Sequence, residues 1–362
     1  MTQTCNHCGN PLEPTHRICT QCGRAVSKWN FSSKGPASTA PIKSLPKANR
    51  VHAIKNLNNA ESTTPDFDDH GREAARALIP QIGEIESIFS AVKSSPHIRG
   101  NTSYNETASK IELIYWPDSL VVNASAASKS DEDNGEDNGE DESEELVRQT
   151  SSSRQIKTPV VNYHLGWDYM MRCVSISVAS CIDDRTNKLI SASELAHALQ
   201  KCSQSMGDGE FIESELDYFY EQACSLSSRG LARARDITRS INTEAIAHEI
   251  GHIVLHHLDT EHLLNETYEI SRNQERQADD FASNVLGSMS YREHVFLGHA
   301  VSSMFFCWLE ETMKPGQVTT HPHSRERLEN ALRGNSQAAK EAAETYGLTK
   351  DFIMQAIPPA PL

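Results

Sequence analysis

The sequence contains no apolar run that approaches the roughly 20 residues needed to cross a bilayer. It also lacks a basic start followed by an apolar segment and a cleavage site, which together form a secretory signal. Lysine and arginine do not form an extended basic patch that could bind the phosphate backbone of a nucleic acid. Nucleic acid is therefore not favoured as a partner. We therefore expect a cytoplasmic protein that does not span a membrane.

Hydrophobic residues are also few, at 38% of the 362 residues, so the packed core is expected to be shorter than the chain. The net charge is -15, but residues 131–145 alone contain ten Asp and Glu and no Lys or Arg. A tract of this composition cannot bury enough apolar surface to fold. We predict a disordered acidic insertion at residues 127–150.

Four of the nine cysteines form two CxxC pairs, each followed by a glycine. Cys5, Cys8, Cys19 and Cys22 can close a tetrahedral site with no open position, which is typical of structural zinc. A redox role is the competing interpretation, but the short span and the glycines favour a zinc ribbon over residues 1–24. The segment Cys5–Cys22 has one arginine and no lysine or aromatic residue, so a protein is the preferred partner of the ribbon.

The most informative motif is HEIGH, at residues 248–252. If residues 243–258 are helical, a spacing of four places His248 and His252 on one face, about one turn apart. Neutral imidazoles suit zinc, and Glu249 beside them can take a proton from water that the metal activates. The motif therefore predicts a catalytic zinc site.

The residues around this motif predict a buried helix. Apolar residues before and after it form one apolar face, and Gly251 leaves room for close approach of another backbone. Asn242 or Thr243 can cap the start of the helix.

A catalytic zinc usually takes three protein ligands, so a third must come from further along the chain. Leu255 and Leu258 stand where the extended HExxHxxGxxH pattern needs glycine and histidine, which excludes that pattern. His256 and His257 are rivals, but one straight helix rarely offers three histidines to one tetrahedral ion. We interpret both as residues at the end of the helix.

The better candidate is the segment SRNQERQADDFA at residues 271–282. Ser271 and Gln274 form a capping-box pattern, and apolar residues follow at helical spacing, so we predict a second buried helix. Glu275 lies one turn before Asp279 on it. One carboxylate could bind zinc while the other accepts the outward N–H of a ligand histidine.

HEIGH followed by this ExxAD segment resembles the gluzincin metallopeptidases. Residues 319–328, TTHPHSRERL, resemble the THPxxxxR[IL] segment of the HtpX and CAAX-prenyl-protease family. Residues 111–124 are similar to the strand of that family that ends in Asn-Ala. These four segments occur in the order found in the family.

The resemblance implies a zinc-dependent endopeptidase that acts on a protein or peptide substrate. His248, His252 and Glu275 would be the zinc ligands and Glu249 the general base. Asp279 would support a ligand from outside the coordination sphere. His321 and Arg327 would lie near the active site and help to hold the substrate or its oxyanion. The chain would carry one catalytic and one structural zinc ion.

Two departures from the family pattern keep a second family open. Only 22 residues separate His252 from Glu275, and Ser125 replaces the aromatic residue usual after Asn-Ala. The short spacing is similar to that of the ImmA/IrrE regulatory metallopeptidases, which cleave a repressor or a stress or phage-defence factor. The motifs are also compatible with a non-catalytic scaffold that recruits partners through the ribbon, or with a latent enzyme that needs activation.

We predict an α+β fold: a mainly helical, zincin-like domain with a small edge sheet, plus the ribbon. Its parts are the zinc ribbon (1–24), a flexible linker (25–70), the metallopeptidase domain (71–335) and a C-terminal tail (336–362). Within the domain we expect a helix from Gln81 to Val92, a core helix at Leu297–Leu309 and a strand within Tyr163–Ile182, centred on Val174–Val178. An extended substrate would add to the edge of this sheet. Four arginines between residues 229 and 239 are expected to be solvated surface.

Overall fold

A computed structural model describes residues 69–129, 158–207, 209–258, 268–289, 292–312, 324–333 and 337–359, and two short strands near the start. Spatially the chain divides into two units, Met1–Thr39 and Ala40–Leu362. In the first unit, β1 (Gln3–Thr4) pairs antiparallel with β2 (Pro11–Leu12). The four cysteines of the predicted ribbon, most of the predicted linker and His321 lie outside the described residues.

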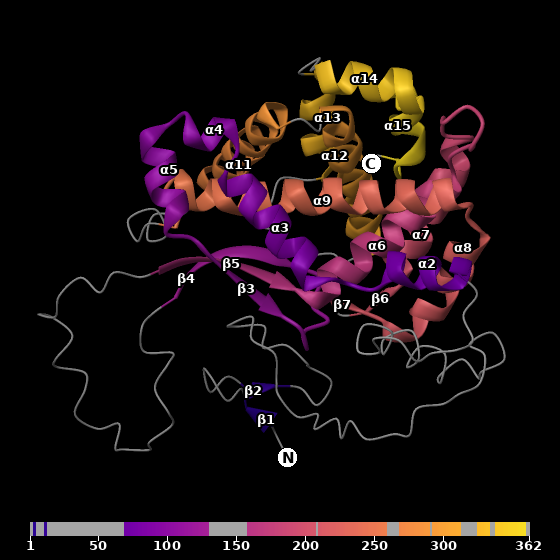
Figure 1. Cartoon of the computed structure of the whole chain (residues 1–362), viewed down its shortest axis with the longest axis horizontal. Helices are drawn as coiled ribbons and strands as arrows, with labels where there is room; N and C mark the ends of the chain where they lie inside the picture. The colour runs from indigo at the N-terminus through magenta and orange to yellow at the C-terminus, as the bar shows by residue number, and fades with distance from the viewer. Residues whose placement is uncertain are drawn as a thin grey trace, which may run out of the picture. The chain divides into compact units, whose positions relative to one another are not determined.

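The second unit is mainly helical with a small sheet (Figure 1). Its helices are α2 (Asp69–Leu78), α3 (Ile82–Lys93), α4 (Pro96–Arg99), α5 (Thr102–Ser109), α6 (Leu165–Ser180), α7 (Ala192–Gln204), η4 (Glu213–Glu215), α8 (Leu216–Ser225), α9 (Ser228–Val254), α11 (Tyr268–Ser288), α12 (Arg292–Thr312), α13 (Ser324–Arg333), α14 (Gln337–Tyr346) and α15 (Lys350–Ala356). The prediction of a mainly helical α+β domain is confirmed.

The 27-residue helix α9 lies at the centre of this unit, in contact with α3, α6, α11 and α12 (Figure 1). The predicted start at Asn242 or Thr243 is wrong, because the helix begins fifteen residues earlier and Ser227 caps it by accepting the Gly230 N–H. The cause is that the apolar period continues upstream of residue 242, through buried leucine, alanine and isoleucine side chains. Asn242 is instead buried inside the helix, where its side chain accepts from Trp167 and donates to Asp168.

One of the arginines at the start of α9 is not solvated surface, contrary to the prediction. Arg233 is only 7% exposed, and its guanidinium donates to Asp184 and Asn187 in the loop that follows α6. A buried guanidinium needs such partners to offset the loss of water. The contact ties the first half of α9 to that loop.

The strand predicted at Val174–Val178 is wrong, because these residues belong to α6. Every residue of α6 from Gly166 to Ala179 is buried. A helix that is buried on all sides has no polar face, so its sequence shows no alternation of polar and apolar residues at helical spacing. Its β-branched residues then favour the prediction of a strand.

The larger sheet of the second unit has the strand order β3-β5-β4: β3 (Glu112–Trp116), β5 (Thr158–His164) and β4 (Ala124–Lys129). A second sheet consists of β6 (Met206–Gly207) and β7 (Glu210–Phe211), which pair antiparallel. The central strand β5 runs parallel to β3 and antiparallel to β4. The stretch at residues 111–124 is therefore not one strand but β3 and the first residue of β4. Because β4 continues to Lys129, residues 127–129 belong to the sheet, and most of the predicted acidic insertion lies outside the described residues.

The edge of the sheet that faces α9 is formed by β4. Within the described residues β4 pairs only with β5, and it contacts α9. His164 N–H donates to Asn123 O, and in an antiparallel ladder such pairs alternate with unpaired positions. The backbone groups of Ala124, Ala126 and Ser128 therefore point to the outer edge.

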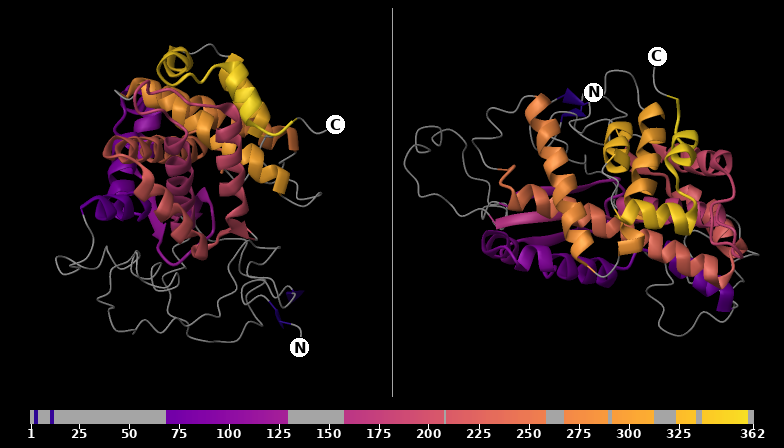
Figure 2. Two further views of the ribbon diagram at one scale, coloured as in Figure 1. Left: turned by 90° about the vertical axis from the view of Figure 1, so that its right-hand side faces the viewer. Right: turned by 90° about the horizontal axis from the view of Figure 1, so that it is seen from above.

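The helices predicted at Gln81–Val92 and Leu297–Leu309 are confirmed as α3 and α12. Both have buried apolar side chains along one face, as their sequence period requires. The predicted polar tail, residues 336–362, contains α14 and α15, which pack against α12 and bury Ala342 and Ile353 (Figure 2). These helices extend the core beyond the boundary predicted from the sequence.

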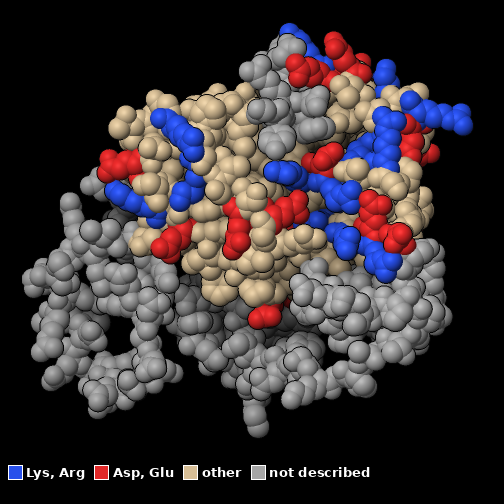
Figure 3. Space-filling view, viewed as in Figure 1, with Lys and Arg blue, Asp and Glu red and all other residues tan. Residues whose placement is uncertain are grey.

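The described part of the surface in Figure 3 carries Lys and Arg interspersed with Asp and Glu, so this face has no single sign of charge. None of the described helices combines the length and the apolar character that crossing a membrane would require. Five cysteines of the second unit are free thiols, four of them buried, as expected for core residues.

Candidate metal centre

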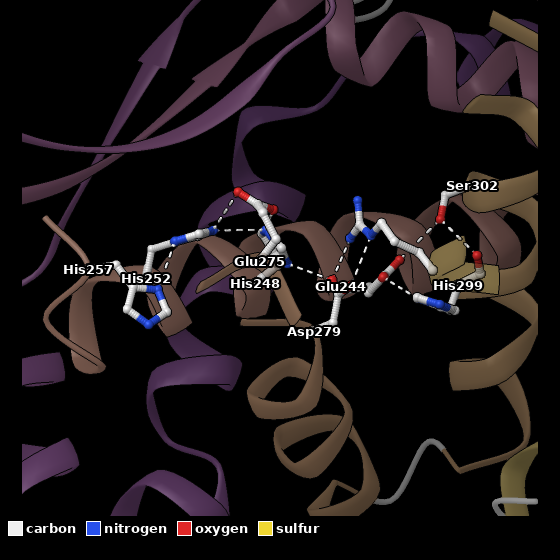
Figure 4. Close-up of polar contacts among 9 residues, drawn as sticks. Glu244, His248, His252, His257, Glu275, Asp279, His299 and Ser302 are labelled. Atoms are coloured by element: carbon white, nitrogen blue, oxygen red, sulfur yellow. Dashed lines mark hydrogen bonds and ion pairs between the residues drawn. The ribbon is translucent and has the colours of Figure 1, made fainter. Parts of the chain in front are cut away.

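Two histidines of α9 and one glutamate of α11 point toward one another (Figure 4). One ligand atom from each of His248, His252 and Glu275 lies within 4.8 Å of the other two. The Nε2 atoms of the two histidines are 3.1 Å apart. Glu275 Oε2 lies 3.2 Å from His248 Nε2, and Glu275 Oε1 lies 3.4 Å from His252 Nε2. Their side chains are 7%, 13% and 7% exposed, so the three groups face one another largely out of water.

The outward nitrogen of His248 is held by a carboxylate. Its Nδ1 lies 2.9 Å from Asp279 Oδ1, one turn after Glu275 on α11. Arg327 of α13 binds the same carboxylate with two nitrogens, Nε to Oδ2 at 2.9 Å and Nη2 to Oδ1 at 2.5 Å. A neutral His248 that donates through Nδ1 keeps the lone pair of Nε2 for the interior of the site.

The outward nitrogen of His252 is held by a second histidine. His257 Nδ1 lies 3.0 Å from His252 Nδ1, and His257 Nε2 lies 3.0 Å from Gln277 Oε1 on α11. Sequence reasoning assigned His257 only to the end of the helix. His257 does lie at the end of α9, and the structure adds that the residue is 5% exposed and faces a predicted metal ligand.

Glu249 turns toward the sheet. Its Oε2 accepts the backbone N–H of Ala126 at 2.6 Å, from the outer edge of β4. The predicted general base thus lies between the histidines of α9 and the strand edge. Its second oxygen, Oε1, can accept a proton from water.

The close crossing of α9 and α11 explains why Glu275 reaches the histidines. A Cβ at Gly251 would lie 3.0 Å from the ring of Phe281 and 3.4 Å from the backbone of Ala278. A side chain here would press on α11, so glycine allows the approach predicted from the sequence. The capping box predicted at Ser271 and Gln274 is wrong, since α11 begins at Tyr268 and Ser271 lies inside it.

A second buried pair lies one turn before His248 on α9. Glu244 Oε1 is 2.5 Å from His299 Nδ1 of α12, and Glu244 Oε2 accepts from Ser302 at 3.2 Å. Figure 4 shows this pair continuing the row of polar side chains that starts at His257. Neither residue belongs to a recognised motif. Only Glu244 has a helical spacing from His248 that places both on one face of α9, and no pattern in the sequence pointed to His299 on α12.

Neighbouring charges and hydrogen bonds shift the pKa values of His248 and Asp279 in opposite directions. Burial alone would lower the pKa of His248, but the hydrogen bonds that its ring donates to the carboxylates of Asp279 and Glu275 outweigh burial and raise the pKa to about 10. A metal that binds Nε2 would therefore displace a proton from His248 and leave the neutral ring that donates through Nδ1. Burial raises the pKa of Asp279, yet the Arg327 charge and His248 hold it well below its usual range. Asp279 is therefore a carboxylate at neutral pH.

The predicted site residues His248, His252, Glu275, Asp279 and Arg327 thus lie within one connected cluster, and Glu249 follows His248 on α9. Arg327 contacts Asp279, so its proposed contact with a substrate oxyanion stays a prediction. His321 and the four cysteines lie outside the described residues.

A sequence model of the family described as Peptidase U49 matches residues 234–347. This segment is similar to a peptidase family. It includes most of α9 and all of α11, α12 and α13, and so every residue of the cluster on those helices. The match supports a protease function, and the HtpX-like and ImmA-like assignments remain predictions. No curated protein and no solved structure matches the chain.

Proposed function

We propose that this chain is a zinc-dependent endopeptidase whose metal is held by His248 Nε2, His252 Nε2 and the carboxylate of Glu275. The observation that carries the proposal is the convergence of these three donors within 4.8 Å, beside Glu249 on the same helix. The similarity of residues 234–347 to a peptidase family supports it independently.

The donor set suits zinc. Two imidazoles and one carboxylate are a common ligand set of catalytic zinc, and three protein ligands leave one position open. The outward nitrogens of both histidines have partners, so each ring can present its Nε2 lone pair to the metal. When bound, zinc would supply Lewis acidity toward the scissile carbonyl and lower the pKa of water.

Glu249 is proposed as the general base. The Ala126 N–H holds Oε2 and so fixes the orientation of the carboxylate, which leaves Oε1 to take a proton from water. Glu249 takes a proton from the attacking water and passes it to the leaving amine. This transfer requires a carboxylate next to the metal ligands, which the position after His248 provides.

The outer edge of β4 is the proposed binding edge for an extended peptide. The outward backbone groups of Ala124 and Ser128 and the carbonyl of Ala126 can pair with a substrate strand. The bond from Ala126 N–H to Glu249 places that strand next to the proposed base. This edge replaces the strand at Val174–Val178 predicted from the sequence.

The finer assignment remains an HtpX-like gluzincin, on the strength of the segment at residues 319–328, with an ImmA-like regulatory protease as the alternative. The short interval between His252 and Glu275 favours the alternative. For the ribbon, we propose a structural zinc on Cys5, Cys8, Cys19 and Cys22 and a role in binding a protein partner.

The test compares the wild type with Glu249→Gln on a proteome-derived peptide library. We expect Glu249→Gln to lose activity by a factor of about 10²–10⁴ while it keeps its zinc, because only the proton transfer is removed. Glu269→Gln, the same change on the exposed start of α11, is the matched control and should cleave like the wild type. Equal cleavage by Glu249→Gln and wild type would show that the role of Glu249 is wrong. Purified wild type should contain about two zinc ions per chain.

A further inference from the structure

The chain reverses direction directly after the second predicted ligand. Helix α9 ends at Val254, and two backbone bonds close a Schellman motif: His256 N–H to Ile253 O at 3.1 Å and His257 N–H to His252 O at 2.9 Å. His256 takes the left-handed position of this motif, with φ 63°, where glycine is usual. The motif folds His257 back onto the last turn of α9, beside His252.

The contacts of His257 determine which nitrogens carry protons. Gln277 turns its amide oxygen to His257 Nε2, and because an amide oxygen accepts, this contact favours the proton of His257 on Nε2. His257 Nδ1 is then an acceptor, and it faces His252 Nδ1 at 3.0 Å. His252 must therefore carry its proton on Nδ1, which leaves its Nε2 lone pair free toward His248 and Glu275.

We propose that His257 is a positioning residue, which holds His252 in the tautomer and ring orientation that present Nε2 to the metal, with Gln277 setting the tautomer of His257. The inference rests on the proposed function, because it assigns a support to one of the proposed zinc ligands. The two proposed histidine ligands thus have different partners at Nδ1: a neutral imidazole, His257, for His252, and the carboxylate of Asp279 for His248.

The two supports also differ in their surroundings. Asp279 is held by the partly buried guanidinium of Arg327, whereas Gln277 is exposed and water can replace its amide. The buried ring of His257 is therefore the main support of His252, and Gln277 contributes less.

The test measures zinc affinity, by competition with a chromophoric chelator, for the full chain and its variants. His257→Phe keeps a ring but removes the acceptor, and zinc affinity should fall about 10–100-fold. His257→Asn places a side-chain oxygen near the former Nδ1, and we expect it to restore most of the affinity. His256→Gly, which suits the left-handed turn, is the matched control and should bind zinc like the wild type.

Glu275→Ala is the reference for complete loss of the proposed site. All variants keep the four cysteines of the predicted ribbon, so a difference in zinc affinity between variants comes from the site on α9 and α11. If His257→Phe binds zinc as tightly as the wild type, the positioning role is wrong and the proposed function stands. If Glu275→Ala also binds like the wild type, the proposed metal site itself is wrong.

A second measurement needs no variant and keeps the proposal testable if His257→Phe fails to fold. Long-range ¹H–¹⁵N correlations of the imidazole rings in the wild-type, zinc-loaded chain report the tautomers. We expect the Nδ1–H form for His252 and the Nε2–H form for His257. An Nδ1–H form of His257 would contradict the proposal.

Discussion

Glu244 and His299 are charged groups that stabilise each other inside the protein. Burial raises the pKa of Glu244, but the His299 charge outweighs it and holds the pKa below its ordinary value. Burial lowers the pKa of His299, but Glu244 outweighs it and raises the pKa. Both charged forms are therefore favoured by folding.

The pH dependence follows from these two directions. The contribution of Glu244 is present above its ordinary pKa of 4.5 and is lost as pH falls through the lowered value. The contribution of His299 is present below its ordinary pKa of 6.5 and is lost as pH rises through the raised value. The pair therefore stabilises the protein most between about pH 4.5 and 6.5.

We expect His299→Gln to lower the free energy of unfolding by up to about 3 kcal/mol in this window, because it leaves a buried carboxylate without its counter-charge. The loss should shrink as pH rises through the raised pKa of His299. Urea unfolding of wild type and variant across this pH range measures it. A loss that is the same at every pH would contradict an ionic role for the pair.

The sequence predicted some residues of the site and missed others. His248, Glu249 and His252 follow from helical spacing, because ligands one turn apart must share a face. His257 could not be recognised, because its role depends on a turn that begins only where α9 ends. Arg327 was expected near the active site, and it lies against Asp279, which contacts His248; its contact with a substrate stays a prediction.

At the level of helices, the crossing of α9 and α12 depends on the absence of a side chain at Gly298. A Cβ there would lie 2.5 Å from Ser240 Oγ and 2.9 Å from the Ser240 backbone carbon on α9. Backbone atoms of a central helix cannot move as a flexible side chain can. Gly298 therefore sets the distance between the helices that carry Glu244 and His299.

We expect Gly298→Ala to lower the free energy of unfolding by about 1–3 kcal/mol, because the methyl group overpacks this crossing. Gly287→Ala on α11 is the control, since a Cβ there meets nothing within 4 Å and alanine favours helix by up to about 1 kcal/mol. Chemical denaturation of both variants measures the difference. Equal effects at the two positions would show that α9 and α12 do not pack this closely.

Helices were predictable wherever they keep one polar face, as in α3 and α12. The failure at α6 has the opposite cause, because a helix buried on all sides shows no alternation of polar and apolar residues. The start of α9 was placed too late because Asn242 and Thr243 resemble capping residues, although the apolar period continues before them.

Across the second unit, the proposed metal would join two separate helices at the point where they cross. His248 and His252 lie on α9, while Glu275 lies on α11, with nine residues between the helices outside the described chain. A ligand that binds only the folded protein raises its stability. Metal binding should therefore stabilise the crossing of α9 and α11.

We expect a chelator to lower the melting temperature of the wild type more than that of Glu275→Ala. The additional loss corresponds to about 3 kcal/mol when free metal exceeds its dissociation constant a hundredfold. Both proteins carry the same four cysteines, so the difference isolates the site on α9 and α11. Identical responses to the chelator would mean that Glu275 does not bind the metal. Thermal unfolding with and without chelator makes the measurement.

The sequence by itself determined the residues that can bind a metal and the helices that carry them, because helical period and ligand spacing are local properties. Only the tertiary structure decided which of these residues meet. Gly251 admits α11 close to α9, the turn at His256 returns His257 to His252, and β4 brings Ala126 to Glu249. Each of these contacts joins segments whose approach depends on packing, and packing is not encoded in the spacing of any one segment.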